Sequence, residues 1–444
     1  MNFKISSKIR FLIQVLNESV FLKNVLFVSG GTIFAQFLVL LFSPVISRIY
    51  SAEDFGIFQQ YQAILSFLLV MSGLRYELAI MVPKEKKSAF NLLILSILIN
   101  VGFSSIILIL VFILDLFGYS FSLIRGMIHL VYFIPFALLG ASLYQSLNNM
   151  VIREKEFKKI GTTKIIQSTG LVGGQVIVGG FWDKTHGLIW GDLLSKFLGI
   201  STFIRVLYKK NKQYLLTLNW NELKVLGKKY KKFPLLSVPS GLINVAGITM
   251  PTFLIGNYFG LSVLGFYALV DRIFAAPAML IGQSVSQVYM GDFIDLSHTN
   301  PDALLARFKN LIKKIGLLTF IPYSLAAISA PFLFGWVFGQ NWSEAGIIFA
   351  ILAPMQFISI IVWPLIPTLN LLERQNWQLV WDFLRLLLVI LVFAFSHYFN
   401  LSPRLSIFLY GVVMLFSYVI HLGLSYIAIK RRIKQFNGLS INDN

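Results

Sequence analysis

The stretch GFYALVDRIFAAPAMLIGQSVSQVYM, from Gly265 to Met290, decides the fold. It is long enough to cross a bilayer, because ~20 helical residues span the ~30 Å hydrocarbon core. Asp271 and Arg272 nevertheless stand side by side within it. A charge at the centre of a membrane helix costs ~2.5–3.5 kcal/mol, so this pair must be hidden from lipid in a helix bundle or a water-filled cavity. We therefore predict a transporter whose internal cavity holds an anionic substrate, with Arg272 as the leading contact.

The composition excludes an ordinary soluble domain. Of the 444 residues, 57% are hydrophobic and 13% are charged, whereas soluble domains have ~25% charged residues. The chain has no cysteine, which excludes disulfides, thiolate metal sites and cysteine nucleophiles. The five histidines show no metal-ligand spacing. We therefore expect neither a metal site nor a cofactor.

Apolar runs separated by short breaks predict an all-α, polytopic membrane protein with about 12 transmembrane helices. Residues 1–23 do not resemble a cleavable signal peptide and are predicted to form an amphipathic segment on the inner leaflet. The predicted spans are 24–49, 56–80, 88–114, 121–150, 157–181, 186–208, 234–260, 264–290, 309–335, 343–370, 375–399 and 403–429.

The basic residues alternate with these spans. The great majority of the 38 Lys and Arg fall on the side that carries both chain ends, and the other side holds only Arg48, Arg125, Lys184 and Arg404. This asymmetry is the positive-inside pattern, which predicts that both termini are cytoplasmic. It also explains the net charge of +19 without nucleic acid as a partner.

The two halves of the chain look related. Matching residues recur at nearly one offset: Ser29-Gly30 with Ser240-Gly241, Tyr50 with Tyr258, and Gly56 with Gly265. Because each half has six spans, the halves would be parallel repeats with a binding site between them near the midplane.

This repeat predicts the domain organisation. We expect a cytoplasmic N-terminal segment (1–23), an N-terminal six-helix lobe (24–208), a basic cytoplasmic linker (209–233), a C-terminal six-helix lobe (234–430) and a cytoplasmic tail (431–444). The apolar and basic residues of the linker suggest an interfacial helix against anionic lipid.

Other ionisable residues within the spans are candidates for the site. Lys196 and Arg385 are candidate cavity cations, with Asp192 and Asp382 three or four residues before them. Each acid can pair with its base on one helix face, so a structural reading stays open for both pairs. With Asp271, the acids are candidates for ion coupling.

Two further groups lie near span ends. Arg48 at the outer end of the first span is a fourth candidate cation, although snorkelling to the interface explains it equally. Arg75 and Glu77, near the predicted cytoplasmic end of the second span, mark either a cavity mouth or a helix anchor.

Three motifs carry a resemblance to a known family: SRIYSAEDFGIF from Ser47, LRYELAIMVP from Leu74 and GFYALVDRIFAAP from Gly265. With the twelve spans in two halves, they resemble Wzx-type O-antigen flippases of the multidrug/oligosaccharidyl-lipid/polysaccharide (MOP) exporter superfamily. The resemblance implies a MATE-like fold and movement of an undecaprenyl-diphosphate-linked oligosaccharide from the cytoplasmic to the periplasmic leaflet of the inner membrane. It also implies a basic central cavity, coupling to a proton or sodium gradient, a place in lipopolysaccharide biosynthesis, and a polysaccharide polymerase and a chain-length regulator as partners.

Two alternatives remain. A multidrug or cation antiporter of the same superfamily would favour carboxylates in the cavity over bases. A membrane glycosyltransferase or polymerase could use Glu53 and Asp54 in the first outer loop. That loop is short, however, and an acidic pair after Ser51 is also a typical helix N-terminus, so we predict no enzymatic activity.

Overall fold

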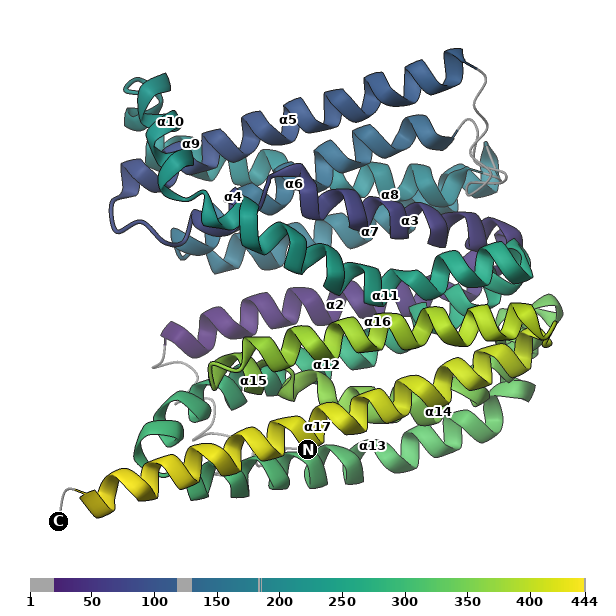
Figure 1. Ribbon diagram of the computed structural model, residues 1–444. Helices are drawn as coiled ribbons and strands as arrows, with labels where there is room; N and C mark the ends of the chain where they lie inside the picture. The colour runs from purple at the N-terminus through teal and green to yellow at the C-terminus, as the bar shows by residue number, and fades with distance from the viewer. Residues whose placement is uncertain (1–19, 118–129, 183, 185, 443–444) are drawn as a thin grey trace, which may run out of the picture.

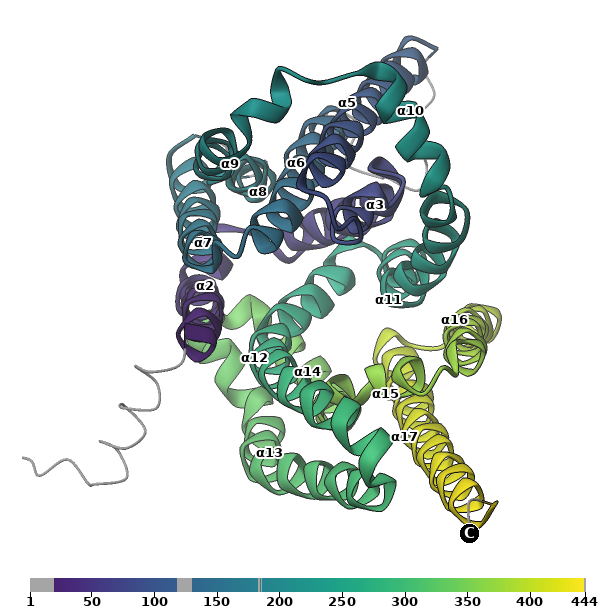
Figure 2. The ribbon, with the colours of Figure 1, turned by 90° about the vertical axis from the view of Figure 1, so that its left-hand side faces the viewer.

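The computed structural model describes residues 20–117, 130–182, 184 and 186–442. The predicted amphipathic segment lies almost entirely outside these residues. Within them the chain is all helical, and no strand occurs in the described ranges. Figures 1 and 2 show two helix bundles, with α2 (Val20–Ile49) and α11 (Val238–Phe259) at opposite edges of the boundary between them.

The first bundle, here the N-lobe, comprises the helices up to residue 215. They are α2, α3 (Ala52–Ser72), the short α4 (Tyr76–Ala79), α5 (Lys86–Leu116), α6 (Phe133–Arg153), α7 (Phe157–Phe181), α8 (Gly187–Phe197) and α9 (Ile200–Leu215).

The second bundle, here the C-lobe, comprises the helices from residue 238 onward. They are α11, α12 (Leu261–Thr299), α13 (Pro301–Phe338), α14 (Ser343–Val362), the short α15 (Pro367–Leu371), α16 (Gln375–Tyr398) and α17 (Pro403–Asn442). The lobes are joined through α10 (Trp220–Lys229) and one π-helical turn, η3 (Phe233–Ser237).

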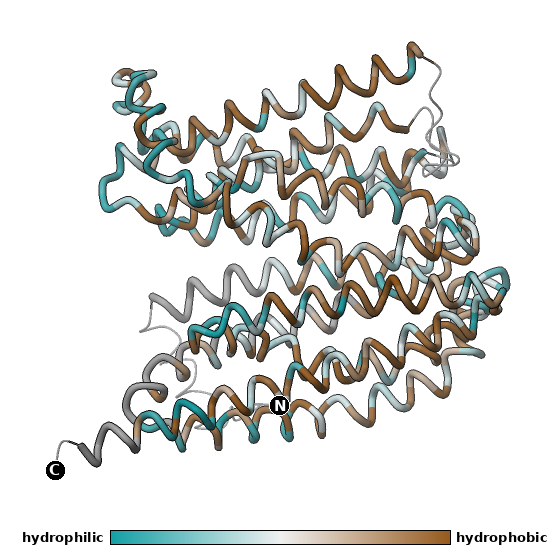
Figure 3. The backbone as a smooth tube through the Cα atoms, viewed as in Figure 1, coloured by the Kyte–Doolittle hydropathy of each residue, from teal (hydrophilic) through white to brown (hydrophobic). Residues whose placement is uncertain are grey.

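Ten helical segments of the described chain are long and apolar enough to cross a membrane. Two more of the predicted spans are continuous helices, α7 and α12, of 25 and 39 residues. The predicted count of about 12 spans is therefore confirmed. Hydrophobic residues dominate the middle of the helices and hydrophilic ones gather at their ends (Figure 3), as a lipid-embedded bundle requires.

Three predicted spans differ in their bounds. The second ends at Ser72 rather than at residue 80, because Leu74 and Arg75 turn the backbone into the left-handed region (φ 47° and 62°). The sixth breaks at Gly199, whose φ of 85° suits glycine. The fourth begins as an α-helix at Phe133 rather than at 121, and part of the expected start lies outside the described residues.

The molecule has two chemically distinct ends along the direction of the helices. The end called here the basic end carries α10, the connection from α3 to α5, and the C-terminal part of α17. The opposite end carries the turns from α2 to α3 and from α11 to α12, and the 3-10 turn η4 (Gln340–Trp342). In Figure 1 the basic end is on the left and the opposite end on the right.

Within the predicted linker, α10 is bound to the N-lobe by polar contacts. Lys87 Nζ donates to Glu222 Oε1 at 2.6 Å, and Asn91 Nδ2 donates to Glu222 Oε2 at 2.8 Å. Tyr76 donates its hydroxyl to the backbone oxygen of Gly227 at 2.8 Å. The helix is thus held at its first turn and at its far end.

Low pH should weaken the attachment of α10 to the N-lobe through Glu222. The hydrogen bond from Lys87 holds the pKa of the Glu222 carboxyl below its usual value, so its stabilising contribution is present above the ordinary pKa and is lost as pH falls through the lowered one. We expect Glu222→Gln to speed limited proteolysis between residues 216 and 233 by up to about five-fold, the range for an exposed pair, and to remove the acid dependence. The exposed Glu373→Gln is the control. Equal cleavage in both variants would contradict the prediction.

Candidate functional site

A cavity of about 600 Å³ lies against the boundary of the lobes. Its N-lobe wall is α3, and its C-lobe walls come mainly from α11, α12, α14, α16 and α17. Two kinds of side chain dominate the lining. Amides come from Gln59, Gln62, Asn244, Gln356 and Gln378, and aromatic rings come from Tyr267, Phe274, Trp363, Trp381, Tyr410 and Tyr418. We call it the central cavity.

The charges of the central cavity nearly cancel. Among the described lining residues the formally charged ones are Asp271 and Arg385. Arg385 Nη2 lies 3.1 Å from Asp382 Oδ1, and the guanidinium carbon is 4.6 Å from the centre of the Trp381 ring. Asp382 also accepts from Gln378 at 3.1 Å. The cavity is therefore polar and aromatic rather than strongly basic.

Space for the Arg385 guanidinium comes from a glycine of α11. A Cβ on Gly247 would stand 2.8 Å from Arg385 Nη2. Arg385 Nε is buried and makes no hydrogen bond to any part of the chain that the structure describes. The guanidinium therefore has one N–H group, at Nε, that is not bonded to Asp382. An anionic group could accept a hydrogen bond from it.

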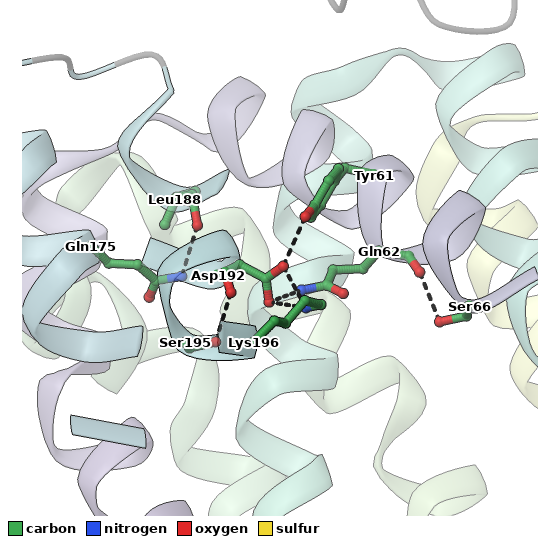
Figure 4. Close-up of polar contacts among 8 residues, drawn as sticks. All are labelled: Tyr61, Gln62, Ser66, Gln175, Leu188, Asp192, Ser195 and Lys196. Carbon is green, nitrogen blue, oxygen red and sulfur yellow. Dashed lines mark hydrogen bonds and ion pairs between the residues drawn. The ribbon is translucent and has the colours of Figure 1, made fainter. Parts of the chain in front are cut away.

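Asp192 of α8 organises a second polar centre, shown in Figure 4. Its carboxylate accepts from the Tyr61 hydroxyl at 2.9 Å, from Gln62 Nε2 at 2.8 Å and from Lys196 Nζ at 2.6 Å. Asp192 is only 4% exposed, so these three donors replace the water that a buried carboxylate needs. The predicted pairing of Asp192 with Lys196 is thus present.

Lys196 also lines a smaller cavity of about 410 Å³ inside the N-lobe. Its other walls carry the amides of Gln145, Asn148 and Gln167 and the ring of Tyr144. Gln62 lines the central cavity and Lys196 the smaller one, and both bind Asp192. The carboxylate therefore connects the two cavities.

The other two candidate cations do not line these cavities. Arg272 is half-buried, and its Nη2 donates to Gln175 Oε1 on α7 at 3.2 Å. It links α12 of the C-lobe to the N-lobe. Arg48 is exposed at the opposite end, where Nη2 donates to the backbone oxygen of Val337 at 3.4 Å. Of the four predicted cations, the structure places Arg385 and Lys196 on cavity walls and the other two at contacts between the lobes.

At the opposite end the lobes meet through Trp342, which the sequence did not single out. Its indole nitrogen donates to the backbone oxygen of Ser47 at 2.7 Å. Its ring stacks edge-on against Phe55 of the N-lobe, with centroids 4.9 Å apart. Ser47 in turn donates to the backbone oxygen of Phe338 at 3.0 Å. These contacts join the C-lobe to the end of α2 and the start of α3.

Two glycines complete this contact. A Cβ on Gly56 of α3 would stand 2.1 Å from the backbone oxygen of Leu261, and a Cβ on Gly265 of α12 would stand 1.6 Å from that of Ala52. Each glycine is the fifth residue of its helix, since α3 begins at Ala52 and α12 begins at Leu261. The contact is therefore reciprocal, as related repeats would give. The sequence showed both glycines as repeat markers without showing this role.

The central cavity has residues that sequence reasoning missed. Trp381 and Tyr410 are ordinary aromatic residues of apolar runs, and Gln378 is one of many polar residues near span ends. Gln378 and Trp381 share a face of α16 with Arg385, and the arrangement of α16 and α17 brings Tyr410 to the same cavity. The one signal in the sequence was the pair Asp382 and Arg385, which lies on the same helix.

Comparisons with known proteins agree with this arrangement. Residues 45–346 match the family described as polysaccharide biosynthesis protein. The teichuronic acid biosynthesis protein TuaB of Bacillus subtilis (strain 168) is 27% identical over 156 residues, which is 35% of this chain and 32% of that protein. The aligned region is thus about a third of the relative's length.

Two solved structures show the same fold. The lipid II flippase MurJ in an inward closed conformation superposes with a TM-score of 0.62 at 13% identity, over 95% of this chain and 93% of that one. An inward-facing MATE family multidrug resistance transporter of the MOP superfamily gives 0.61 at 14% identity, over 90% and 96%. The predicted resemblance is confirmed: this multi-pass membrane protein has the MOP-superfamily fold and belongs to the polysaccharide biosynthesis protein family.

Proposed function

We propose that the protein is a flippase that moves an undecaprenyl-diphosphate-linked oligosaccharide from the cytoplasmic to the periplasmic leaflet by alternating access. The observation that carries the proposal is the lining of the central cavity. Aromatic rings offer flat apolar faces to sugar rings, and amides donate to and accept from hydroxyl groups. The cavity lies beside a lobe boundary, where a two-lobe transporter holds its cargo.

Charge assigns roles to the ionisable residues. In this proposal Arg385 binds the diphosphate through the donor that Asp382 does not use, and Lys196 is a second anion contact in the N-lobe. Asp271, Asp192 and Asp382 are the carboxylates available for ion coupling. Arg272 and Arg48 hold the lobes together rather than contacting the cargo, in accordance with their hydrogen bonds to Gln175 and Val337.

The basic end would face the cytoplasm, as the distribution of Lys and Arg favours. The lobes touch through Trp342, Gly56 and Gly265 at the opposite end. The structure would then correspond to a state that is closed toward the periplasm, and the lipid tail would remain in the bilayer while the sugar crosses.

The cavity also has a feature that favours a second function. Asp271 lines it and Asp382 lies against its only described lining cation. Two carboxylates beside one guanidinium would favour an organic cation as the cargo, so a multidrug antiporter is the alternative. Nothing comparable favours a glycosyltransferase, because Glu53 and Asp54 lie in the first turn of α3 and Ser51 caps that helix.

The test is flipping in liposomes. We expect the purified protein to move a fluorescent undecaprenyl-diphosphate disaccharide between leaflets, so that a membrane-impermeant quencher reaches a fraction that changes with time. A fluorescent phosphatidylcholine in the same liposomes should not move, which separates flipping from general lipid scrambling. Transport of ethidium without movement of the disaccharide lipid would favour the antiporter instead.

A further inference from the structure

A carboxyl group outside the two cavities is buried, and one of its oxygens has no hydrogen-bond partner among the described residues. Glu77 lies in α4, beyond the span that ends at Ser72, and is 3% exposed. Its Oε2 has no hydrogen-bond partner in the described parts of the chain. The nearest base, Arg75, lies 3.8 Å away through Nη1 and Oε1, longer than a hydrogen bond.

A second acceptor faces the same place. Glu77 Oε2, Asn100 Oδ1 and Ser96 Oγ lie 2.6, 3.0 and 3.3 Å from the position of a Cβ on Gly73. Because Gly73 has no side chain, these three oxygens can all point into the space beside it. Asn100 is 1% exposed, and its Oδ1 also has no partner among the described residues.

The uncharged side-chain donors of α5 and α6 around these oxygens are in use. Asn100 Nδ2 donates to the backbone oxygen of Ser142 at 3.3 Å and to Ser146 Oγ at 3.0 Å, which fixes the orientation of the amide. Ser146 donates its one proton to the same backbone oxygen at 3.0 Å. In this arrangement Ser96 donates to Ser146, 2.8 Å away. Neither the amide of Asn100 nor the two serine hydroxyls then offers a hydrogen to Glu77 Oε2 or to Asn100 Oδ1.

We propose that Glu77 is a proton-binding site of this protein, and that its bound proton completes the contact with Asn100. A protonated carboxyl gains one O–H donor, which supplies the hydrogen that two facing acceptors lack. Burial raises the pKa of the Glu77 carboxyl by more than its own backbone N–H and the charge of Arg75 lower it, and the net direction favours this form.

Few charged groups face Glu77. Arg75 on its own turn is the nearest. α5 contributes the neutral Ser96 and Asn100. α6 contributes Asn149, which donates to the backbone oxygen of Glu77 at 3.0 Å, and Arg153, whose guanidinium binds the backbone oxygens of residues 80, 81, 83 and 84. The π-helical turn η3, Phe233–Ser237, is uncharged. Arg75 is therefore the group that responds to the charge of Glu77.

Arg75 connects the site to the other lobe. A Cβ on Gly241 of α11 would stand 2.4 Å from Arg75 Nη2, so the guanidinium lies against the C-lobe at the basic end. Its Nε is buried and unpartnered within the described structure. Loss of the Glu77 charge releases Arg75 from its ion-pair partner among the described residues, and the contact with α11 changes. Proton binding thereby biases the position of the lobes.

The test measures lobe separation against pH. The natural chain has no cysteine, so Lys84→Cys and Asn376→Cys place spin labels on the N-lobe and the C-lobe at the basic end. We expect the label–label distance distribution to change with one pH midpoint. Glu77→Gln should hold the acidic distribution at every pH. Glu154→Gln, another buried carboxylate near the basic end with bases at 3.8 and 3.9 Å, should titrate like the parent.

Asn100→Asp tests the same site without touching Glu77. A second carboxylate facing the first should raise the midpoint by about one pH unit or more. A Glu77→Gln protein that keeps the parental titration, or an unmoved midpoint in Asn100→Asp, would overturn the proposal. A response to sodium at constant pH that Glu77→Gln abolishes would overturn the proton as the ligand. The role of the proton in transport rests on the proposed flippase function, but this measurement needs no substrate, so either can fail alone.

Discussion

Replacing Gly265 by alanine is expected to disfavour closure of the lobes at the opposite end and to slow transport. A Cβ there would lie 1.6 Å from the backbone oxygen of Ala52, and backbone cannot move aside as a flexible side chain can. Overpacking costs ~1–3 kcal/mol, which shifts a two-state equilibrium by ~5–150-fold. Gly56→Ala should act in the same direction, because its Cβ would lie 2.1 Å from the backbone oxygen of Leu261.

The reciprocal contact explains why either substitution suffices. α3 and α12 cross where each begins, and each glycine admits the first residue of the other helix. Trp342 holds the same junction through Ser47 and Phe55. A state open at this end must break those contacts, whereas a closed state must form them. Alternating access needs both states, so a protein held in either one cannot complete a cycle.

Spin labels at Glu53→Cys and Asn341→Cys report this end, because both residues are exposed and lie on different lobes. The label–label distance should lengthen in Gly265→Ala and in Gly56→Ala, and flipping in liposomes should fall by ~5–150-fold. Gly102→Ala on α5 is the matched control, since a Cβ there meets nothing within 4 Å. An unchanged distance in Gly265→Ala would remove this contact from the closing mechanism.

The sequence predicted the positions of the helices better than it predicted which side of each helix faces the cavity. Length and hydropathy suffice for a span, and the twelve predicted spans correspond to the helices observed. Breaks within the predicted spans were missed, such as the one after Ser72. Leu74 and Arg75 adopt the left-handed region although neither residue type favours it, so their types gave no sign of the turn.

The choice between Asp271 and Arg272 shows a second limit. Neighbours on a helix point about 100° apart, and Arg272 was predicted to be the leading cavity contact. The structure places Asp271 on the wall and turns Arg272 toward α7. The rotation of α12 is set by packing against α3 at Gly56 and Gly265, and no pattern within α12 itself contains that information.

Pairs on one helix were more predictable. Asp192 with Lys196 and Asp382 with Arg385 have spacings of four and three, and both pairs are formed. Their further partners come from other helices: Tyr61 and Gln62 bind Asp192 from α3. Contacts between helices depend on the fold, and the sequence spacing does not encode them.

Arg385 is expected to be needed for both stability and transport, and the two can be separated. Its side chain is 7% exposed, and it neutralises Asp382. Arg385→Ala leaves that carboxylate buried without its base, which destabilises a protein by ~3–5 kcal/mol. We therefore expect a marked loss of thermal stability, and loss of flipping with it.

Two further variants separate the role of this charged pair in stability from its role in transport. Arg385→Met with Asp382→Asn removes both charges and should recover most of the stability, because neutral groups of similar size replace the buried pair. Arg385→Lys keeps the charge but loses the planar fork and the stacking on Trp381. Both should unfold near the parental temperature in fluorescence-detected melting. Flipping of the disaccharide lipid should be absent in the double variant and reduced by ~10- to 100-fold in Arg385→Lys, because each charge-assisted bond to phosphate contributes ~1.5–3 kcal/mol. If the double variant flips the lipid at the parental rate, Arg385 balances Asp382 and does not bind the diphosphate.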